Sequence, residues 1–292
     1  MTGKVATIGF FDGVHLGHQH LLSQLKEVAN EHNLSTLVIT FSQLPRQVVN
    51  HDSSRFTLLT TTEEKLQLLD LAGIDQCEVM EFTPELAALT AFDFMKLLHD
   101  QYQVHALLIG YDHRFGHNRT EGFDDYVKYG KELGIEVIQA TELPAVSSSK
   151  IRELLLLGDL QVANKCLGHP YMLEGMVVSG FHVGQTLGFP TANLQMAPEK
   201  LIPANGVYAV QVELDGKAYQ GMLNIGTRPT LANGNNRSIE VHIFDFHDDI
   251  YEKPLKLLLI KRTRGEKKFA TKEQLKRQLQ QDATLIKSLL TP

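Results

Sequence analysis

The sequence has 292 residues, a formal net charge of −6 and a hydrophobic share of 43%, which are typical of a soluble globular protein with room for two domains. The acidic balance argues against a general nucleic-acid binder, and no apolar run is long enough to span a membrane, so we expect neither kind of partner. Cys77 and Cys166 match no metal or redox spacing, and no signal peptide precedes the first apolar run. We therefore expect a cytoplasmic protein.

Short apolar runs alternate with helical patterns from residue 4 to about residue 140. The runs are apolar almost throughout, as is typical of parallel strands covered by helices on both faces. They span residues 4–11, 34–41, 75–82, 105–110 and 135–140. The alternation predicts a doubly wound α/β domain with a parallel sheet, in which ligands bind beyond the carboxyl ends of the strands.

The second half of the chain follows a different pattern, with strands that succeed one another without long helices between them. The expected strands span residues 171–180, 206–214, 217–226, 237–246 and 255–262. Asp215-Gly216 suits a two-residue hairpin turn that needs positive φ. This pattern predicts a small antiparallel β-barrel or sandwich.

One helix is expected to close the chain. Thr271 and Gln274 suit its N-terminal cap, and its apolar face would lie against the barrel. That face is formed by Leu275, Leu279, Ile286 and Leu290. We place the boundary between the two modules near residue 168, which gives domains 1–168 and 169–292.

The stretch GFFDGVHLGHQH, residues 9–20, lies where the first strand ends and a helix begins. Helix N-termini attract anions, and Gly17 between His15 and His18 lets a phosphate approach the backbone closely. The two imidazoles would donate hydrogen bonds to a polyphosphate. Two alternatives stay open: a metal site that includes Asp12, and histidines that are merely exposed or packed in the core.

A second helix start, SSSKIR at residues 147–152, offers three hydroxyl groups followed by Lys150 and Arg152. A guanidinium beside a helix N-terminus suits a leaving pyrophosphate. Taken alone, the stretch is equally an ordinary N-cap with basic neighbours.

The stretch GFHVGQTLGFPTANL, residues 180–194, is rich in glycine for a barrel. Gly180, Gly184 and Gly188 allow the backbone to bend around phosphates. Thr191 and Asn193 are two residues apart, so on an extended chain both oxygens face one side, as two ligands of Mg²⁺ would. The alternative is a polar turn that begins at a proline.

These motifs carry a family resemblance. GFFDGVHLGHQ followed by SSSKIR is similar to the signature pair of cytidylyltransferase-like nucleotidyltransferases, and GYDHRFG (110–116) narrows the match. GFPTAN, IPANGVYAV, NIGTRPT and IEVHIFDF resemble flavokinases. In this order they resemble the bacterial bifunctional riboflavin kinase/FAD synthetases over residues 5–290. The resemblance implies a nucleotidyltransferase-like α/β module followed by a flavokinase-like barrel with a terminal helix.

The resemblance also implies roles for residues. In the first module His15 and His18 would polarise the ATP phosphates, and Ser148 and Arg152 would hold the pyrophosphate. The remaining ATP-binding positions are Gly9, Phe10, Asp12, Gly17 and Asp112 in the first module, and Gly180, Gly184 and Gly188 in the second. In the kinase module Glu240 would be the base, and Thr191 and Asn193 would coordinate Mg-ATP.

The implied activity is two-step FAD synthesis from riboflavin, with ATP as co-substrate and Mg²⁺ as cofactor. An alternative is a riboflavin kinase whose adenylyltransferase module is weak or inactive, and a further one is a protein that holds FMN without turnover. Two departures from the family pattern bear on these readings: Gln185 replaces a usual arginine, and His113 replaces a usual aromatic residue. Self-association is left open.

Overall fold

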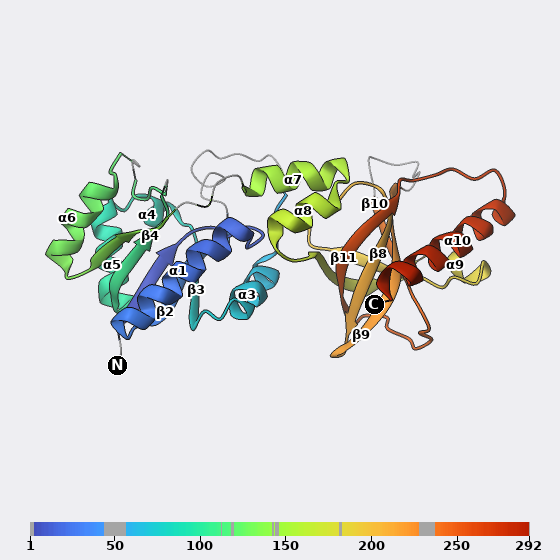
Figure 1. Ribbon diagram of the computed structural model, residues 1–292, viewed down its shortest axis with the longest axis horizontal. Helices are drawn as coiled ribbons and strands as arrows, with labels where there is room; N and C mark the ends of the chain where they lie inside the picture. The colour runs from blue at the N-terminus through green and yellow to red at the C-terminus, as the bar shows by residue number, and fades with distance from the viewer. Residues whose placement is uncertain are drawn as a thin grey trace. The chain divides into compact units, whose positions relative to one another are not determined.

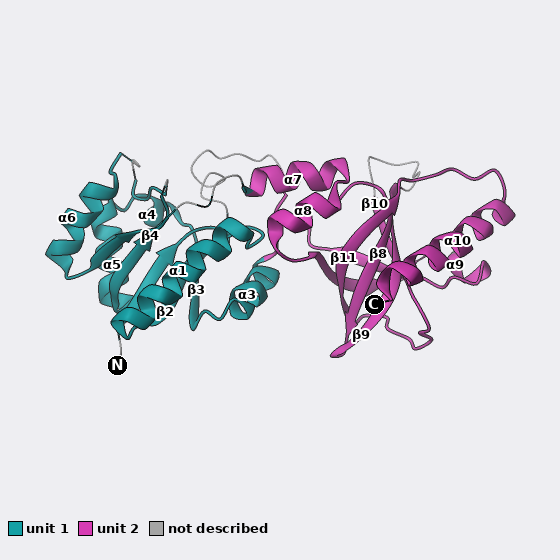
Figure 2. Cartoon of the chain, in the orientation of Figure 1, with its two compact units in different colours: residues 1–56, 62–147 teal, residues 57–61, 148–292 magenta. Residues whose placement is uncertain are grey.

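The computed structural model describes residues 3–43, 57–111, 113–117, 120–141, 143, 146–180, 183–227 and 237–291 (Figure 1). The chain divides into two compact units, drawn in different colours in Figure 2. The first unit comprises residues 1–56 and 62–147, and the second comprises residues 57–61 and 148–292.

The first unit is built on a five-stranded sheet in the order β3-β2-β1-β4-β5, and every neighbouring pair is parallel. Its strands are β1 (Lys4–Ile8), β2 (Ser35–Phe41), β3 (Gln76–Met80), β4 (Val104–Ile109) and β5 (Glu136–Gln139). Its helices are α1 (Leu16–His32), α3 (Thr62–Leu71), α4 (Pro84–Ala87), α5 (Ala91–Tyr102) and α6 (Phe123–Leu133). All five expected strands and the doubly wound class are confirmed.

Helices cover both faces of this sheet, which explains why its strands are apolar almost throughout. Val5 packs with Leu25 of α1 and Leu69 of α3, whereas the next residue, Ala6, packs in a separate core with Met95 of α5. Successive side chains of a strand point to opposite faces, so both faces must be apolar. The carboxyl edge of β1 is left to carry the polar motif of residues 9–18.

The second unit is a closed six-stranded barrel in the order β10-β7-β6-β11-β8-β9, and each described pair is antiparallel. Its strands are β6 (Tyr171–Val178), β7 (Ala192–Met196), β8 (Gly206–Leu214), β9 (Lys217–Thr227), β10 (Arg237–Ile243) and β11 (Pro254–Arg264). The turn between β8 and β9 is confirmed, because Asp215 and Gly216 have φ of 48° and 73°. Strand β7 was not expected from the sequence, because this strand is short and carries the polar residues Asn193 and Gln195.

The terminal helix α10 (Lys272–Leu290) begins as expected: the Thr271 hydroxyl accepts the backbone N–H of Gln274 at 3.2 Å. Its buried Ile286 packs against Val207 of β8 and Met222 of β9. The predicted position of the helix against the barrel is therefore confirmed.

Helices α7 (Ser148–Leu157) and α8 (Leu160–Leu167) belong by their contacts to the second unit, and so do residues 57–61. Within that unit the buried Lys200 ammonium donates to the Leu59 carbonyl at 2.6 Å. A boundary drawn by contacts therefore falls before α7. The functional boundary near residue 168 stays a prediction.

Candidate active sites

The loop after β1 has an unusual backbone. Phe11, Gly13 and Val14 have φ of 54°, 83° and 38°, all in the left-handed region. Such a conformation is a genuine outlier for a β-branched residue such as Val14. Residues in sparsely populated conformations cost on the order of 1–3 kcal/mol each and persist where the surrounding structure holds them. Phe11 and Val14 are both buried, so the core holds this loop in place.

His15 and His18 stand together at the N-terminus of α1. Their rings stack with centroids 3.7 Å apart, and His15 caps the helix by accepting the backbone N–H of His18 at 3.4 Å. An added Cβ on Gly17 would lie 3.2 Å from Cε1 of His15, so glycine leaves room for this ring. The sequence motif thus produces a paired imidazole surface at the positive end of a helix.

The imidazole of His18 is held neutral in the absence of a ligand. Burial lowers its pKa well below its usual range, and the nearby His15 and Lys65 lower it further. Its Nδ1 atom is buried and has no hydrogen-bond partner among the described residues. A neutral imidazole keeps one N–H donor. Its other ring nitrogen can take up a proton, and a bound anion would favour that protonation.

Lys65 of α3 is a residue that the sequence analysis missed. Its ammonium is buried and donates to the carbonyls of Phe10 at 3.2 Å and Phe41 at 2.9 Å, and to the Thr40 hydroxyl at 3.0 Å. It also lies 4.4 Å from the centroid of the Phe10 ring. Burial lowers the pKa of Lys65 to about 8, and this effect outweighs the attraction of Asp12, which raises the pKa. The lysine ties the loop after β1 to the end of β2.

A pocket of about 300 Å³ opens at this place, which we call the β1 corner. Among the expected residues, Gly9, Phe10, His15, Gly17 and His18 line it. Asp12, the remaining expected residue of this motif, is buried and is not part of the lining. The described residues contain no cluster of three or more histidine, cysteine, aspartate or glutamate side chains that could hold a metal ion.

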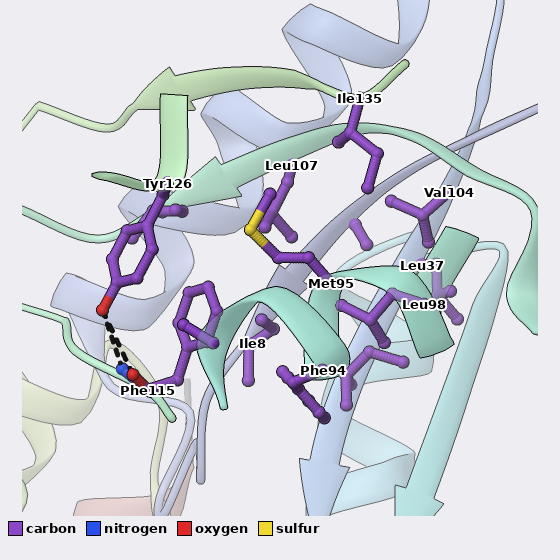
Figure 3. Packing of buried hydrophobic residues seen from close by; sticks show 14 of the residues in the cluster. Ile8, Leu37, Phe94, Met95, Leu98, Val104, Leu107, Phe115, Tyr126 and Ile135 are labelled. Atoms are coloured by element: carbon purple, nitrogen blue, oxygen red, sulfur yellow. Dashed lines mark hydrogen bonds between the residues drawn. The ribbon is translucent and has the colours of Figure 1, made fainter. Parts of the chain in front are cut away.

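A second pocket of about 300 Å³ adjoins the β1 corner, and the sequence analysis missed it. We call it the aromatic pocket, because it is lined by Phe10, Phe41, Phe82, Phe94 and Phe115 together with Ile8, Leu86, Ala87, Leu89, His113, Arg114 and Gly116. Figure 3 shows Phe115 beside Tyr126, with Ile8 and Phe94 in the same cluster. The Tyr126 hydroxyl accepts the Phe115 N–H at 3.1 Å, which fixes one wall. The pocket suits a flat apolar ring system.

The second anion motif lies in the other compact unit. Ser148 begins α7, and Arg152 one turn later donates from Nε to the carbonyl of Thr57 at 3.0 Å. Lys150 pairs with Glu153 at 3.0 Å on the surface of the same helix. The pyrophosphate role of Ser148 and Arg152 stays a prediction. Asp112 lies outside the described residues.

Strand pairing in the barrel brings together three expected kinase residues. Glu240 of β10 is directly opposite Asn193 of β7, forty-seven positions earlier in the chain. An added Cβ on Gly180 would overlap the Asn193 amide, so the glycine lets this side chain lie against the backbone of residue 180. Thr191 lines a pocket together with Gly180. A hydroxyl, an amide oxygen and a carboxylate therefore lie within one small region.

Two pockets meet at Thr191. One has a volume of about 660 Å³ and includes Gly180, Gln185 and Thr191 in its lining; we call it the Gly180 pocket. The other, of about 300 Å³, includes Gly184, Thr191 and Glu240; we call it the Glu240 pocket. Gly188, at φ 83°, shapes the turn between the short helix α9 (Val183–Thr186) and β7. The barrel thus holds two neighbouring cavities that share Thr191 in their linings.

The α/β unit and the barrel each carry cavities lined by the motif residues, as expected of a chain with two separate transferase modules. Family models match both: FAD synthetase over residues 1–153 and riboflavin kinase over residues 167–290. A bifunctional riboflavin kinase/FMN adenylyltransferase of Escherichia coli strain K12 is 38% identical, and one of Listeria monocytogenes is 36% identical. Each match covers 96% of this chain and 90% of the relative. The chain belongs to the bifunctional riboflavin kinase/FMN adenylyltransferase family.

A crystal structure from Streptococcus pneumoniae, named as a macrolide-efflux protein, matches the whole fold with a TM-score of 0.89 and 31% identity. The match covers 98% of this chain and 94% of that one. It shows that both units recur together in a solved structure. None of the helices in the described part of the chain is long and apolar enough to cross a membrane.

Proposed function

We propose that this chain makes FAD in two steps. The barrel transfers the γ-phosphate of ATP to the 5′-hydroxyl of riboflavin and gives FMN. The α/β unit then transfers AMP from a second ATP to FMN and gives FAD and pyrophosphate. Whole-length similarity to bifunctional relatives supports both steps. The unpaired cysteines Cys77 and Cys166 agree with the cytoplasm as the compartment.

The kinase assignment rests on one observation: Thr191 lines two neighbouring cavities. ATP would occupy the Gly180 pocket, and the ribityl end of riboflavin would occupy the Glu240 pocket. Glu240 takes the proton of the 5′-hydroxyl as that oxygen bonds to the γ-phosphorus and the bond to the β-phosphate oxygen breaks. The three expected glycines, 180, 184 and 188, would keep the backbone beside the phosphates free of side chains.

The oxygens of Thr191 and Asn193 fit Mg²⁺, because this ion prefers hard oxygen donors and is often held by only one or two protein ligands together with substrate phosphates. An ion held by Thr191 and Asn193 would neutralise charge that develops on the phosphates. Asn193 is kept in place by its buried position on β7, directly opposite Glu240.

In the adenylylation step, the flavin ring of FMN would lie in the aromatic pocket and the ATP phosphates in the β1 corner. A phosphate oxygen of FMN attacks the α-phosphorus of ATP, and the bond to the β-phosphate breaks. His15, His18 and the first N–H groups of α1 stabilise charge on the phosphates. Ser148 and Arg152 would hold the departing pyrophosphate. No covalent enzyme intermediate is needed, since positioning and charge neutralisation carry the reaction.

A time course from riboflavin with excess ATP and Mg²⁺, followed by chromatography, tests the proposal. FMN should rise first and FAD should follow. Glu240→Gln should stop FMN formation from riboflavin and leave FAD formation from supplied FMN intact. FMN that accumulates without FAD would favour the alternative with an inactive first unit. Loss of both activities in a folded Glu240→Gln protein would contradict the two-site assignment.

A further inference from the structure

The β1 corner and the aromatic pocket share part of their walls. Ile8, Phe10 and His113 line both cavities. Two of these side chains are apolar, so the imidazole of His113 is the polar side chain common to the two linings. His113 belongs to neither the paired histidines of α1 nor the sheet, because it follows β4 in the loop that begins at Gly110.

The structure holds His113 in this place through its neighbours. Its backbone N–H donates to the carbonyl of Gly110 at 3.0 Å, which closes a tight turn at the end of β4. Its ring centroid lies 6.2 Å from that of Phe115. Phe115 is itself fixed, since its N–H donates to the Tyr126 hydroxyl and its ring stacks on Tyr126 with centroids 4.3 Å apart. His113 is therefore held where the linings of the two cavities meet.

FMN has two chemically different ends, a flat apolar ring and a phosphate dianion on a ribityl chain. If the ring occupies the aromatic pocket, the phosphate must reach the β1 corner, where it meets the α-phosphorus of ATP. The attacking phosphate would then lie near the place where the two linings meet, beside His113. An imidazole N–H donates a charge-assisted hydrogen bond to a phosphate oxygen, which a phenylalanine ring cannot do.

We propose that His113 binds the phosphate of FMN and orients it for attack, as a substrate-positioning residue particular to this chain's loop. This inference rests on the proposed adenylylation and deepens it. A phenylalanine at this position would supply only apolar contact, whereas the histidine supplies an N–H donor where the two linings meet.

The test compares His113→Phe, which restores an aromatic ring, with His113→Gln, which keeps an N–H donor. The KM for FMN and the KM for ATP are measured in the adenylylation reaction. The Ki of lumiflavin against FMN is measured too, because lumiflavin has the flavin ring but neither ribityl chain nor phosphate. His105→Phe, at an exposed histidine of β4, is the matched control.

His113→Phe should raise the KM for FMN about tenfold, the size of a hydrogen bond to a charged group, and should leave the Ki of lumiflavin and the KM for ATP unchanged. His113→Gln should recover most of the loss, and His105→Phe should behave as wild type. A parallel rise in the Ki of lumiflavin would overturn the inference, since His113 would then contact the ring. A rise in the KM for ATP alone, or no change at all, would overturn it as well.

Failure of this inference is distinguishable from failure of the proposed function. Wild-type protein that made no FAD from FMN would overturn the adenylylation step and the role of His113 with it. Wild-type activity with an unaltered KM for FMN in His113→Phe would overturn only the role of His113.

Discussion

Lys65 makes the stability of the first unit depend on pH in a calculable way. Its folded pKa is about 8, compared with 10.5 for an ordinary lysine. At 1.36 kcal/mol per pH unit, burying the charged ammonium costs the folded state about 3 kcal/mol. Between pH 8 and pH 10.5 the folded protein has released this proton and the unfolded chain has not. The unfolded state then binds more protons, so stability rises with pH across this window.

Replacing Lys65 with methionine removes this pH dependence. Urea unfolding of wild type and Lys65→Met, followed by circular dichroism from pH 7 to pH 10.5, measures the difference in free energy of unfolding at each pH. We expect wild type to gain about 3 kcal/mol relative to the variant between pH 8 and pH 10.5. The comparison cancels the titration of every group that both proteins share.

The same experiment can refute the reasoning. A free-energy difference that stays constant across the window would mean that the buried ammonium keeps its charge. The attraction of Asp12 and the three oxygen acceptors on Phe10, Thr40 and Phe41 would then outweigh the cost of burial. The urea-unfolding transition of the barrel should be identical in the two proteins at every pH, because the substitution lies in the other unit.

Two further substitutions probe the two sites, and a third probes the stability of the barrel. His18→Ala should lower the rate of FAD formation about 10²–10³-fold while FMN formation continues, and parallel loss of both products by chromatography would contradict its assignment. Gln185→Arg should lower the KM for ATP of the kinase reaction several-fold, which corresponds to on the order of 1 kcal/mol, because a charged donor replaces a neutral one. A change in KM confined to the adenylylation reaction would contradict the assignment of this loop to the kinase site. Asp282→Ala should lower the free energy of unfolding of the barrel in urea by about 3–5 kcal/mol. The reason is that Arg264, whose Nη2 lies 2.7 Å from Oδ2 of Asp282, loses its partner. A loss below about 1 kcal/mol would show that the pair is not needed.

The apolar runs in the sequence were enough to predict the sheet, because a parallel strand that is covered on both faces must be apolar almost throughout. The turn at Asp215 and Gly216 was predictable for an equally local reason, since few residues accept positive φ. The pairing of Glu240 with Asn193 was not predictable from spacing alone. It depends on the register of β10 against β7, whereas the resemblance to the flavokinases implied only the separate roles of the two residues.

The aromatic pocket lay beyond local reasoning. Phe41, Phe82 and Phe94 come from separate segments, and each is indistinguishable in sequence from an ordinary core residue. Lys65 was missed for a similar reason: a lysine in a helix is usually exposed, and only the fold shows that this one is buried. A motif search finds residues that contact the reacting groups more readily than residues that support them.

The β1 corner combines three features that are unfavourable in the free protein. The backbone of Val14 has a φ that is rare for a β-branched residue, and the pKa values of His18 and Lys65 are lowered, so carrying a positive charge costs both groups free energy here. A polyphosphate bound as proposed would favour the protonated forms of His18 and Lys65 and so offset the effect of burial on these two groups. Donors that are already in place need no reorganisation during the reaction, which is what makes electrostatic stabilisation of a transition state effective. Phe11 and Val14 are buried, so the core holds the loop after β1 in this conformation; if the β1 corner binds ATP as proposed, that packing would keep its donors in place.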